Sequence, residues 1–460
     1  MNPIYKTFST LKGQYVYDRS TNLIINVEKE EFDLLNKKDE KAIMKFRSKG
    51  YLEDSTIERI RHPNSDYLKY YLSNNLEQLI IQLTQNCNLR CSYCPYMGGY
   101  DNRTYSNKSI NLETIRKGID YILSHSQNTK QISVGFYGGE PLLEMSLLKQ
   151  AVEYIEEVKE GRTIRLNLTT NGTLLSDDNV EYFMEKNIRV LLSLDGAREY
   201  HNAHRVFPNG EGSFDIIMEK LKHIKEKYPE FLSKLMINSV ISTDNDLSCT
   251  NDFFNAEQIL DQLAVNMNTV NENNAKTSIQ YDENFKVIND FEMCKAYLHM
   301  IGKISQRQVS KLYRQNEGKA QIIYKTLKPY RMQEKELHPG GPCLPGIARL
   351  FMDVEGNFYP CERVSEKSEI MRIGHVDQGV DPEKAEYLLN VGATTEQECK
   401  ECFAFNFCKA CCACCDGNTE LSRDKKLAYC NSIRYTALEE MKLITMLKEF
   451  NYNFEQRAYE

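Results

Sequence analysis

Between residues 76 and 330, short apolar runs alternate with longer amphipathic stretches, and this order limits the folds open to the chain. Apolar runs typical of buried strands occupy residues 79–83, 132–137, 164–168, 190–194 and 235–241. Helix-length segments such as 145–159 and 215–228 separate them, and a last strand is expected near 264–270. A repeated strand-then-helix order predicts an α/β fold whose parallel strands are joined by right-handed crossovers.

Three cysteines follow the first of these runs in a C-x3-C-x2-C spacing: Cys87, Cys91 and Cys94. Three close thiols at a strand end can surround one corner of a cuboidal iron–sulfur cluster, whose usual protein ligands are cysteine thiolates. Three ligands for four irons would leave one iron open to a small molecule. The alternative is a structural zinc site, which needs four nitrogen or sulfur ligands, and the next His or Cys in the chain is His125.

Polar or glycine-containing segments stand at the predicted ends of the later strands. They are residues 138–141 (GGEP), 169–172 (TTNG), 193–196 (SLDG) and 240–241 (VI), and residues 201–205 (HNAHR) follow the third of them. Glycine lets the backbone approach a ligand closely, and the C-terminal ends of barrel strands carry the site. One such segment usually marks a turn, but a series at successive strand ends indicates a shared binding site.

Together the cysteine triplet and these segments resemble the radical SAM superfamily. The resemblance implies a partial (β/α)6 TIM barrel with a [4Fe–4S] cluster on the triplet, and cleavage of S-adenosylmethionine to a radical that removes a substrate hydrogen. It also implies that the planar guanidinium of Arg205 pairs with the carboxylate of S-adenosylmethionine. Residues expected to contact this cofactor are Tyr93, Gly138, Gly139, Glu140, Thr169, Asn171, Ser193, Asp195, Arg205, Val240 and Ile241.

Length and composition set further limits. The 460 residues exceed one ordinary domain, so two or three are expected. The net charge is −7, and no stripe of Lys or Arg suggests nucleic-acid binding as the main task. No apolar run approaches the ~20 residues of a membrane span, and the N-terminus lacks a signal-peptide pattern. We therefore expect a cytoplasmic protein.

The 15 cysteines point to metal-binding or catalytic thiols, because the cytosol keeps thiols reduced. Cys249 and Cys294 stand apart and are expected to be small buried residues. The cysteine spacing within residues 335–460 resembles the SPASM domain, which implies two auxiliary [4Fe–4S] clusters. The first would use Cys343, Cys361 and Cys412, and the second Cys399, Cys402, Cys408 and Cys430.

Two features of this region leave alternatives open. Zinc is the rival metal, since C-x2-C is also a zinc spacing. Some relatives complete the first auxiliary cluster with a further cysteine, but residues 344–349 contain none. Its fourth iron is then either open, and able to bind a substrate cysteine, or closed by a surplus thiol and limited to electron transfer. The surplus thiols are Cys411, Cys414 and Cys415.

Glu362 directly follows Cys361. It matches a carboxylate that is proposed to take a proton from the substrate in sulfatase-maturing relatives. A base of this kind must reach its proton and have a suitable pKa. The alternative is that Glu362 only pairs with a nearby cation.

Residues 1–65 are expected to form a separate module before the 76–330 core. Residues 15–17 and 23–27 predict a β-hairpin, and residues 28–36 and 41–50 predict two short helices. This order is similar to the RiPP recognition element, to whose hairpin edge a leader peptide adds itself as a strand. A structural cap without a ligand is the alternative.

The combined resemblance implies a peptide maturase related to sactipeptide and ranthipeptide thioether synthases and to anaerobic sulfatase-maturing enzymes. Such an enzyme would join a cysteine sulfur to a carbon of a ribosomally made precursor peptide, with a flavodoxin- or ferredoxin-type electron donor. Another cross-link, such as a carbon–carbon bond, or formylglycine formation in a sulfatase is the alternative. A non-catalytic iron–sulfur or zinc protein is disfavoured, because an electron carrier needs no cofactor pocket.

Overall fold

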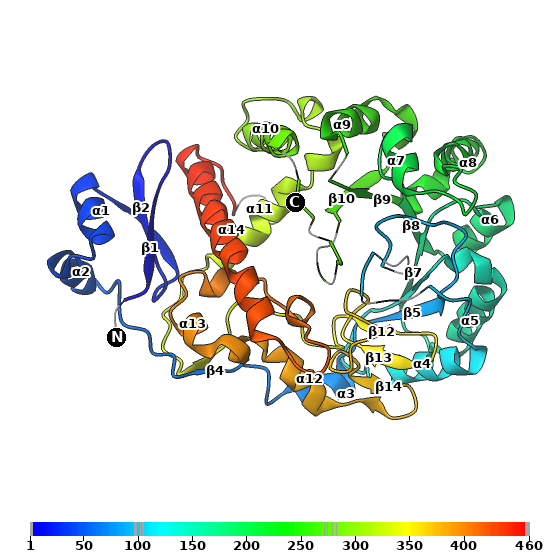
Figure 1. The fold of residues 1–460 in the computed structure, drawn as a ribbon, viewed down its shortest axis with the longest axis horizontal. Helices are drawn as coiled ribbons and strands as arrows, with labels where there is room; N and C mark the ends of the chain where they lie inside the picture. Colours follow the sequence, from blue (N-terminus) through cyan, green and yellow to red (C-terminus); the bar gives the residue numbers. More distant parts are fainter. Residues whose placement is uncertain are drawn as a thin grey trace.

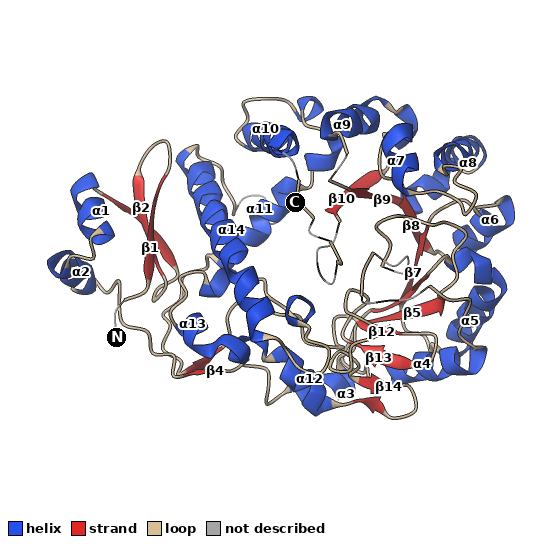
Figure 2. Ribbon diagram, viewed as in Figure 1, coloured by secondary structure: helices blue, strands red, loops and turns tan. Residues whose placement is uncertain are grey.

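The computed structural model of the chain describes residues 3–95, 99–101, 103, 105–243, 245–270, 273, 275–277, 279–281 and 283–455. A ten-stranded mixed sheet forms the centre of its larger part, with helices on the outer side (Figures 1 and 2). A three-stranded sheet near the N-terminus lies apart from it, and helix α14 (Arg423–Glu449) stands between the two (Figure 1). No helix in these ranges is both long and apolar enough to cross a membrane.

Six parallel strands make up the core of the large sheet. They are β5 (Gln78–Thr84), β6 (Ile132–Gly138), β7 (Ile164–Thr170), β8 (Arg189–Ser193), β9 (Leu235–Ile241) and β10 (Ala264–Thr269). Each pairs in parallel with the next along the chain. The six predicted strands are confirmed, and their C-terminal ends lie along one edge of the sheet.

The helices between these strands cover the sheet with apolar stripes. They are α4 (Leu112–Ser124), α5 (Met145–Val158), α6 (Asp177–Glu185), α7 (Arg198–His204), α8 (Phe214–Lys227) and α9 (Leu247–Ala256). On α5 the buried residues are Leu148, Ala151, Val152 and Ile155. This i, i+3, i+4, i+7 spacing places them on one face, where they join the main hydrophobic core. α5 and α8 confirm the two predicted amphipathic stretches.

The C-terminal part adds four strands to the same sheet, which the sequence did not indicate. They are β12 (Leu350–Met352), β13 (Asn357–Tyr359), β14 (Gly374–His375) and β15 (Gly379–Val380). β12 pairs in parallel with β5, and the others follow antiparallel. Strands of two or three residues are too short to show the alternation that identifies a strand. The sheet therefore runs across the expected boundary near residue 335, and the division into domains stays a prediction.

The N-terminal residues form the predicted hairpin and helices. β2 (Gln14–Asp18) pairs antiparallel with β3 (Leu23–Val27), and α1 (Lys29–Asn36) and α2 (Glu40–Arg47) follow. A further strand that was not predicted, β1 (Tyr5–Ser9), pairs with the other side of β2. The buried residues that hold the helices on this sheet are Val16, Val27, Leu35, Ala42, Phe46 and Leu52.

The remaining elements link these two parts. They are α3 (Leu68–Asn74), α10 (Glu283–Met300), α11 (Asn316–Thr326), α12 (Pro382–Leu389), α13 (Glu396–Lys400) and the short pair β4 (Arg59–Ile60) with β11 (Glu336–Leu337). α10 and α11 follow the last parallel strand, β10. Cys294 lies exposed on α10, so its predicted burial is wrong. The buried residues Glu292, Ala296 and Met300 occupy a different face of this helix.

Candidate active site

The three cysteines of the triplet lie in the loop that leaves β5, and backbone hydrogen bonds hold this loop from two sides. On one side the N–H of Gly139, after β6, donates to the carbonyl of Thr84 (2.7 Å). On the other the N–H of Arg90 donates to the carbonyl of Val206 (2.7 Å). The loop is thereby fixed at the C-terminal edge of the parallel strands.

The three thiols lie within electrostatic reach of one another. Burial raises the pKa of the Cys87 thiol to about 12, and the charges of Glu140 and of the other two thiols add to this rise. Burial also raises the pKa of Cys91 to about 11, against the opposing charge of Arg205. The loop therefore gathers neutral thiols that lose their protons when they bind a metal.

The donor set of this loop fits an iron–sulfur cluster. Residues 87–94 carry three thiols and no carboxylate, and thiolates are the ligands that such clusters prefer. In the described ranges no three His, Cys, Asp or Glu side chains converge closely enough for a single ion. A cuboidal cluster gives each thiolate its own iron, so its ligands need not converge on one point.

Gly139 marks the closest approach between this loop and β6. A Cβ at this position would lie 1.9 Å from the carbonyl oxygen of Asn86, the residue before Cys87. Because a backbone carbonyl cannot turn away, we expect Gly139→Ala to destabilise the fold by about 1–3 kcal/mol and to lower the iron bound after reconstitution by about a third. Iron analysis tests this, with Gly318→Ala as the control, since nothing lies within 4 Å of the added Cβ. Full iron in Gly139→Ala would contradict this account of the loop.

The carboxylate of Glu140 joins the ends of β6 and β7. Its Oε1 accepts from the N–H of Leu142 (3.0 Å) and from Oγ1 of Thr170 (2.7 Å), and its Oε2 accepts from the N–H of Asn171 (2.8 Å). Burial raises the pKa of Glu140 against these hydrogen bonds. All three of these hydrogen bonds to the Glu140 carboxylate come from protein groups. The contact of residues 138–141 with S-adenosylmethionine stays a prediction.

Asn171 connects the end of β7 to the cysteine loop. Its Nδ2 donates to Oδ1 of Asn88 (2.9 Å) and lies 3.9 Å from Sγ of Cys87. Thr169 lies in β7 and Ser193 ends β8. Gly138, Glu140, Asn171 and the cysteines thus meet at one edge of the sheet, as the segment order predicted.

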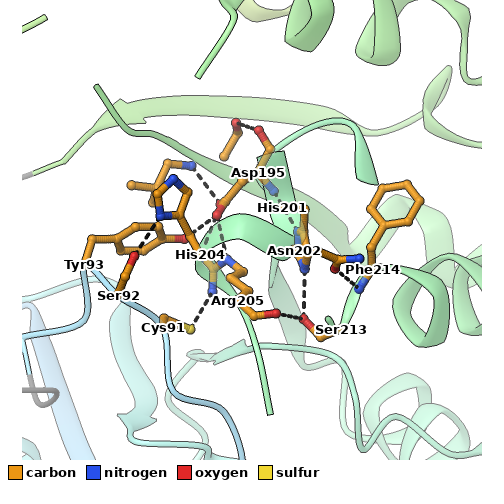
Figure 3. A network of polar contacts seen from close by, with 12 residues as sticks. Cys91, Ser92, Tyr93, Asp195, His201, Asn202, His204, Arg205, Ser213 and Phe214 are labelled. Carbon is orange, nitrogen blue, oxygen red and sulfur yellow. Dashed lines mark hydrogen bonds and ion pairs between the residues drawn. The ribbon is translucent and has the colours of Figure 1, made fainter. Parts of the chain in front are cut away.

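Asp195, after β8, is the centre of a buried polar network (Figure 3). Its carboxylate accepts from Nε (2.8 Å) and Nη2 (3.1 Å) of Arg205 and from the N–H of Val240 (3.1 Å), and Tyr93 also donates to it. Asp195 is 0% and Arg205 7% exposed. Burial alone would raise the pKa of Asp195, but the charge of Arg205 and the hydrogen bonds from Arg205 and Tyr93 together outweigh it and hold the pKa below its ordinary value.

The guanidinium of Arg205 makes most of its contacts with other residues of the protein. Two of its nitrogens face Asp195, while Nη1 lies 3.9 Å from Sγ of Cys91 and the group lies over the ring of Tyr93 (5.3 Å). The expected pairing with a cofactor carboxylate stays a prediction. What the geometry adds is a direct link from the Asp195–Arg205 pair to the cysteine loop.

A second layer holds this pair in place (Figure 3). The N–H of Asp195 donates to Nδ1 of His201 (3.3 Å), and Nε2 of His201 lies 2.9 Å from Oγ of Ser213. Burial lowers the pKa of His201 to about 4, so its ring is neutral at pH 7. Ser213 donates in turn to the carbonyl of Arg205 (3.0 Å). Sequence reasoning missed Ser213, because a serine before a helix usually indicates only a cap.

Glu362 faces the same edge of the sheet from the C-terminal part. Its Oε1 accepts from Nη1 of Arg349 (2.7 Å), and its Oε2 is buried without a hydrogen-bond partner among the described residues. Arg103 donates to the carbonyl of Glu362 and forms an ion pair with Glu366 (2.9 Å). The half-buried side chain of Tyr137, at the end of β6, lies within electrostatic reach of Arg103, Glu362 and Cys94. Sequence reasoning missed Arg103, Glu366 and Tyr137, because single residues without a motif carried no signal.

The cysteines expected for the second auxiliary cluster are brought together. Cys402 lies within electrostatic reach of Cys399, Cys408 within reach of both, and Cys430 likewise within reach of Cys399 and Cys402. These thiols come from α13, the following turn and α14, which are separate elements. Their convergence is consistent with one four-thiolate site.

The thiols expected for the first auxiliary cluster gather only in part. Cys412 lies within electrostatic reach of Cys361, Cys411 and Cys414. Cys343 is exposed. Cys415 is fully buried, and its sulfur lies 3.5 Å from that of Cys414. Cys411 is therefore the surplus thiol that reaches both Cys361 and Cys412.

Comparison with known proteins agrees with this fold and site. Residues 81–247 match the family model of the Radical SAM superfamily. The chain is similar over part of its length to anaerobic sulfatase maturases and to a radical SAM cyclopropyl synthase, and these similarities indicate an enzyme.

Three relatives define the extent of this similarity. The chain is 34% identical over 154 residues to the serine-type anaerobic sulfatase-maturating enzyme of Bacteroides thetaiotaomicron, which covers 33% of this chain and 37% of that protein. It is 24% identical over 269 residues to the radical SAM cyclopropyl synthase TigE of Paramaledivibacter caminithermalis. This match covers 55% of this chain and 52% of TigE. The structure of native anSMEcpe with bound AdoMet aligns with a TM-score of 0.61 at 20% identity, over 81% of this chain and 99% of that one.

These matches limit what carries over. The aligned regions span 37% to 46% of the first three curated relatives. The structural likeness, at 20% identity, concerns the fold alone.

Proposed function

We propose that this enzyme modifies a ribosomally made precursor peptide and installs a thioether between a cysteine sulfur and a carbon of the same peptide. The observation that carries the proposal is that thiols gather in the loop after β5 and in the second C-terminal set, and in part in the first. The four thiols of the second C-terminal set could hold a further cluster. Such a cluster would accept the electron that is released when the C–S bond forms.

The chain's residues have distinct parts in this proposal. Cys87, Cys91 and Cys94 would hold the cluster that binds S-adenosylmethionine. When bound, this pair of cofactors supplies abstraction of a hydrogen from a substrate C–H bond. The buried Asp195–Arg205 pair fixes Cys91 and Tyr93, and the strand-end residues named above would contact S-adenosylmethionine.

The N-terminal module would bind the leader of the precursor peptide. Among the described residues β3 pairs only with β2, so its outer side keeps the free N–H and C=O groups that an added strand needs. The other outer strand, β1, lies beside α14: Tyr15 of the neighbouring strand donates to Glu449 of this helix (2.6 Å). A leader peptide would therefore add as a strand to the free edge of β3. The leader-binding module would comprise residues 1–65. A flavodoxin- or ferredoxin-type protein would supply the electrons.

We propose further that Cys411 supplies the fourth thiolate of the first auxiliary cluster, beside Cys343, Cys361 and Cys412. Cys411 is the surplus thiol within electrostatic reach of both Cys361 and Cys412, whereas Sγ of Cys414 donates to the carbonyl of Cys411 (3.0 Å). A closed first cluster cannot bind a substrate thiol and is left with electron transfer.

Removal of the Cys411 thiol tests this assignment. We expect Cys411→Ala to alter or lose the first auxiliary cluster, with a fall of up to about a third in bound iron or a changed electron paramagnetic resonance spectrum. Cys415→Ala in the same turn is the matched control and should keep both the iron and the spectrum. If Cys411→Ala matches the wild-type chain in both measurements, the cluster does not use this thiol.

Glu362 would take the proton that the substrate thiol releases. Its buried, unpartnered Oε2 can accept a hydrogen bond. Because a positioned general base contributes about 10²–10⁴-fold, we expect Glu362→Gln to lower product formation by that factor while 5′-deoxyadenosine is still released. Glu355→Gln, at an exposed glutamate paired with Lys108, should keep normal product formation. Equal losses in the two variants would rule out a specific role for Glu362.

The substrate proposal is tested with a cysteine-containing precursor peptide. The anaerobically reconstituted enzyme is incubated with this peptide, S-adenosylmethionine and a reductant, and the product is analysed by mass spectrometry. A thioether removes about two hydrogens per link and leaves one fewer thiol for alkylation. An unmodified peptide, or a loss of two hydrogens with every thiol still alkylated, would contradict the thioether.

Formylglycine formation in a sulfatase is the second candidate, because several of the matching relatives are sulfatase maturases. A sulfatase-derived peptide replaces the precursor peptide in the same assay. An aldehyde product reacts with a hydrazide, whereas a thioether does not. An aldehyde from the sulfatase peptide together with an unmodified precursor peptide would establish this alternative.

A further inference from the structure

Helix α14 presents a buried lysine to the four thiols expected for the second auxiliary cluster. Lys426 is 1% exposed, although lysine is almost never fully buried unless it is paired. In the same helix Lys426, Cys430 and Arg434 are spaced by four residues, so they share one helical face. A cysteine thus stands between two cations on this face.

The contacts of the Lys426 ammonium point to a sulfur. Its Nζ donates to the carbonyl of Val391 (2.7 Å) and lies at hydrogen-bond distance, 3.7 Å, from Sγ of Cys399. The nearby carboxylate of Glu398 is engaged by Arg423 instead. Burial of an ammonium is costly unless an anion compensates for it. The anion that this ammonium would contact directly is the thiolate of Cys399 when it binds a cluster.

The second cation reinforces this pattern. Arg434 lies within electrostatic reach of Cys402 and Cys430. Around Cys361 of the first set, by contrast, the cation Arg349 is opposed by the carboxylate of Glu362. The second set therefore lies in the more positive surroundings.

We propose that Lys426 is the counter-ion of the second auxiliary cluster and holds its reduction potential above that of the first. A positive hydrogen-bond donor at a ligand sulfur stabilises the reduced, more negative cluster, because net charge and hydrogen bonds to sulfur set such potentials. The inference rests on the proposed function. When a carbon radical of the peptide and a cysteine thiol form a C–S bond, one proton and one electron are released. The proton passes to Glu362, and the electron passes to the second auxiliary cluster, which is reduced by one electron.

The experiment measures the midpoint potentials of the auxiliary clusters. The full chain with Cys87, Cys91 and Cys94 replaced by alanine keeps only these two clusters, and a redox titration followed by electron paramagnetic resonance resolves them. We expect Lys426→Met to shift the more positive midpoint to a more negative value. Lys426→Arg should keep most of the original value, because it keeps the charge.

Lys425→Met is the matched control. Lys425 is exposed, and its Nζ donates to the carbonyl of Asp416 (2.6 Å), so the same change of charge occurs one residue away without a thiol contact. Its midpoint potentials should equal those of the parent. Equal shifts in Lys425→Met and Lys426→Met would overturn the inference, because they would reflect general surface charge.

The remaining outcomes also decide the question. A midpoint that stays unchanged in a fully loaded Lys426→Met chain overturns the inference. Loss of the second cluster in Lys426→Met but not in Lys426→Arg supports it, since the charge is then required; loss in both variants indicates a packing role and overturns it. A wild-type chain that binds zinc instead of iron and sulfide would refute the proposed function itself, and iron analysis separates that failure from the others.

Discussion

Asp195→Asn is expected to weaken the site by about 3–5 kcal/mol, the cost of removing one partner from a buried ion pair. The carboxylate of Asp195 accepts from Arg205, Tyr93 and the N–H of Val240. An amide cannot balance the charge of Arg205, which would remain buried. Hydrogen exchange at the peptide segment that contains Val240 measures this loss as a fall in the free energy of local opening.

An exposed pair in the same region is the control. Arg198 and Asp215 also form an ion pair, but their side chains are 64% and 53% exposed. Because exposed pairs contribute about 0–1 kcal/mol, Asp215→Asn should change protection little. If the two variants lose protection equally, the Asp195–Arg205 pair does not stabilise the site as argued. At neutral pH the pair contributes fully, since the pKa of Asp195 lies below its ordinary value; that contribution is lost as the pH falls through the lowered pKa.

The parallel strands could be predicted from the sequence because each contains several apolar residues that the fold buries. Residues 235–241 and 164–170 form strands within a residue or two of the predicted bounds. β5 is buried along nearly its whole length, as strands covered on both faces are, whereas β7 and β9 alternate buried residues with less buried ones. The cysteine loop could be predicted for a related reason: several ligands close together in sequence form a pattern that single residues do not.

The rest of the site could not be predicted, because it depends on pairing between distant segments. The three residues of β12 have no signal of their own, yet they place the C-terminal part, and with it Glu362, beside β5. The guanidinium of Arg205 directs two of its nitrogens to Asp195, a pairing that the sequence did not indicate. A sequence shows which group can pair with a carboxylate, and only the fold shows which carboxylate is nearest. The buried Lys426 is a similar case, since its helix pattern predicts a surface residue.

Replacement of Cys87, Cys91 and Cys94 with alanine is expected to abolish peptide modification and 5′-deoxyadenosine release while about two-thirds of the iron remains. The reason is that the three sets of thiols come from different elements. The triplet lies in the loop after β5, whereas Cys399 lies in α13 and Cys430 in α14.

Iron analysis and product analysis of the same preparation test this separation. Cys294→Ala, at an exposed position on α10, is the control and should keep all activity and iron. Modification by the triple variant would refute the radical mechanism. Loss of all iron would show instead that the auxiliary sites depend on the triplet loop for their assembly. Loss of activity with two-thirds of the iron retained would assign hydrogen abstraction to the parallel-strand edge and electron transfer to the C-terminal thiols.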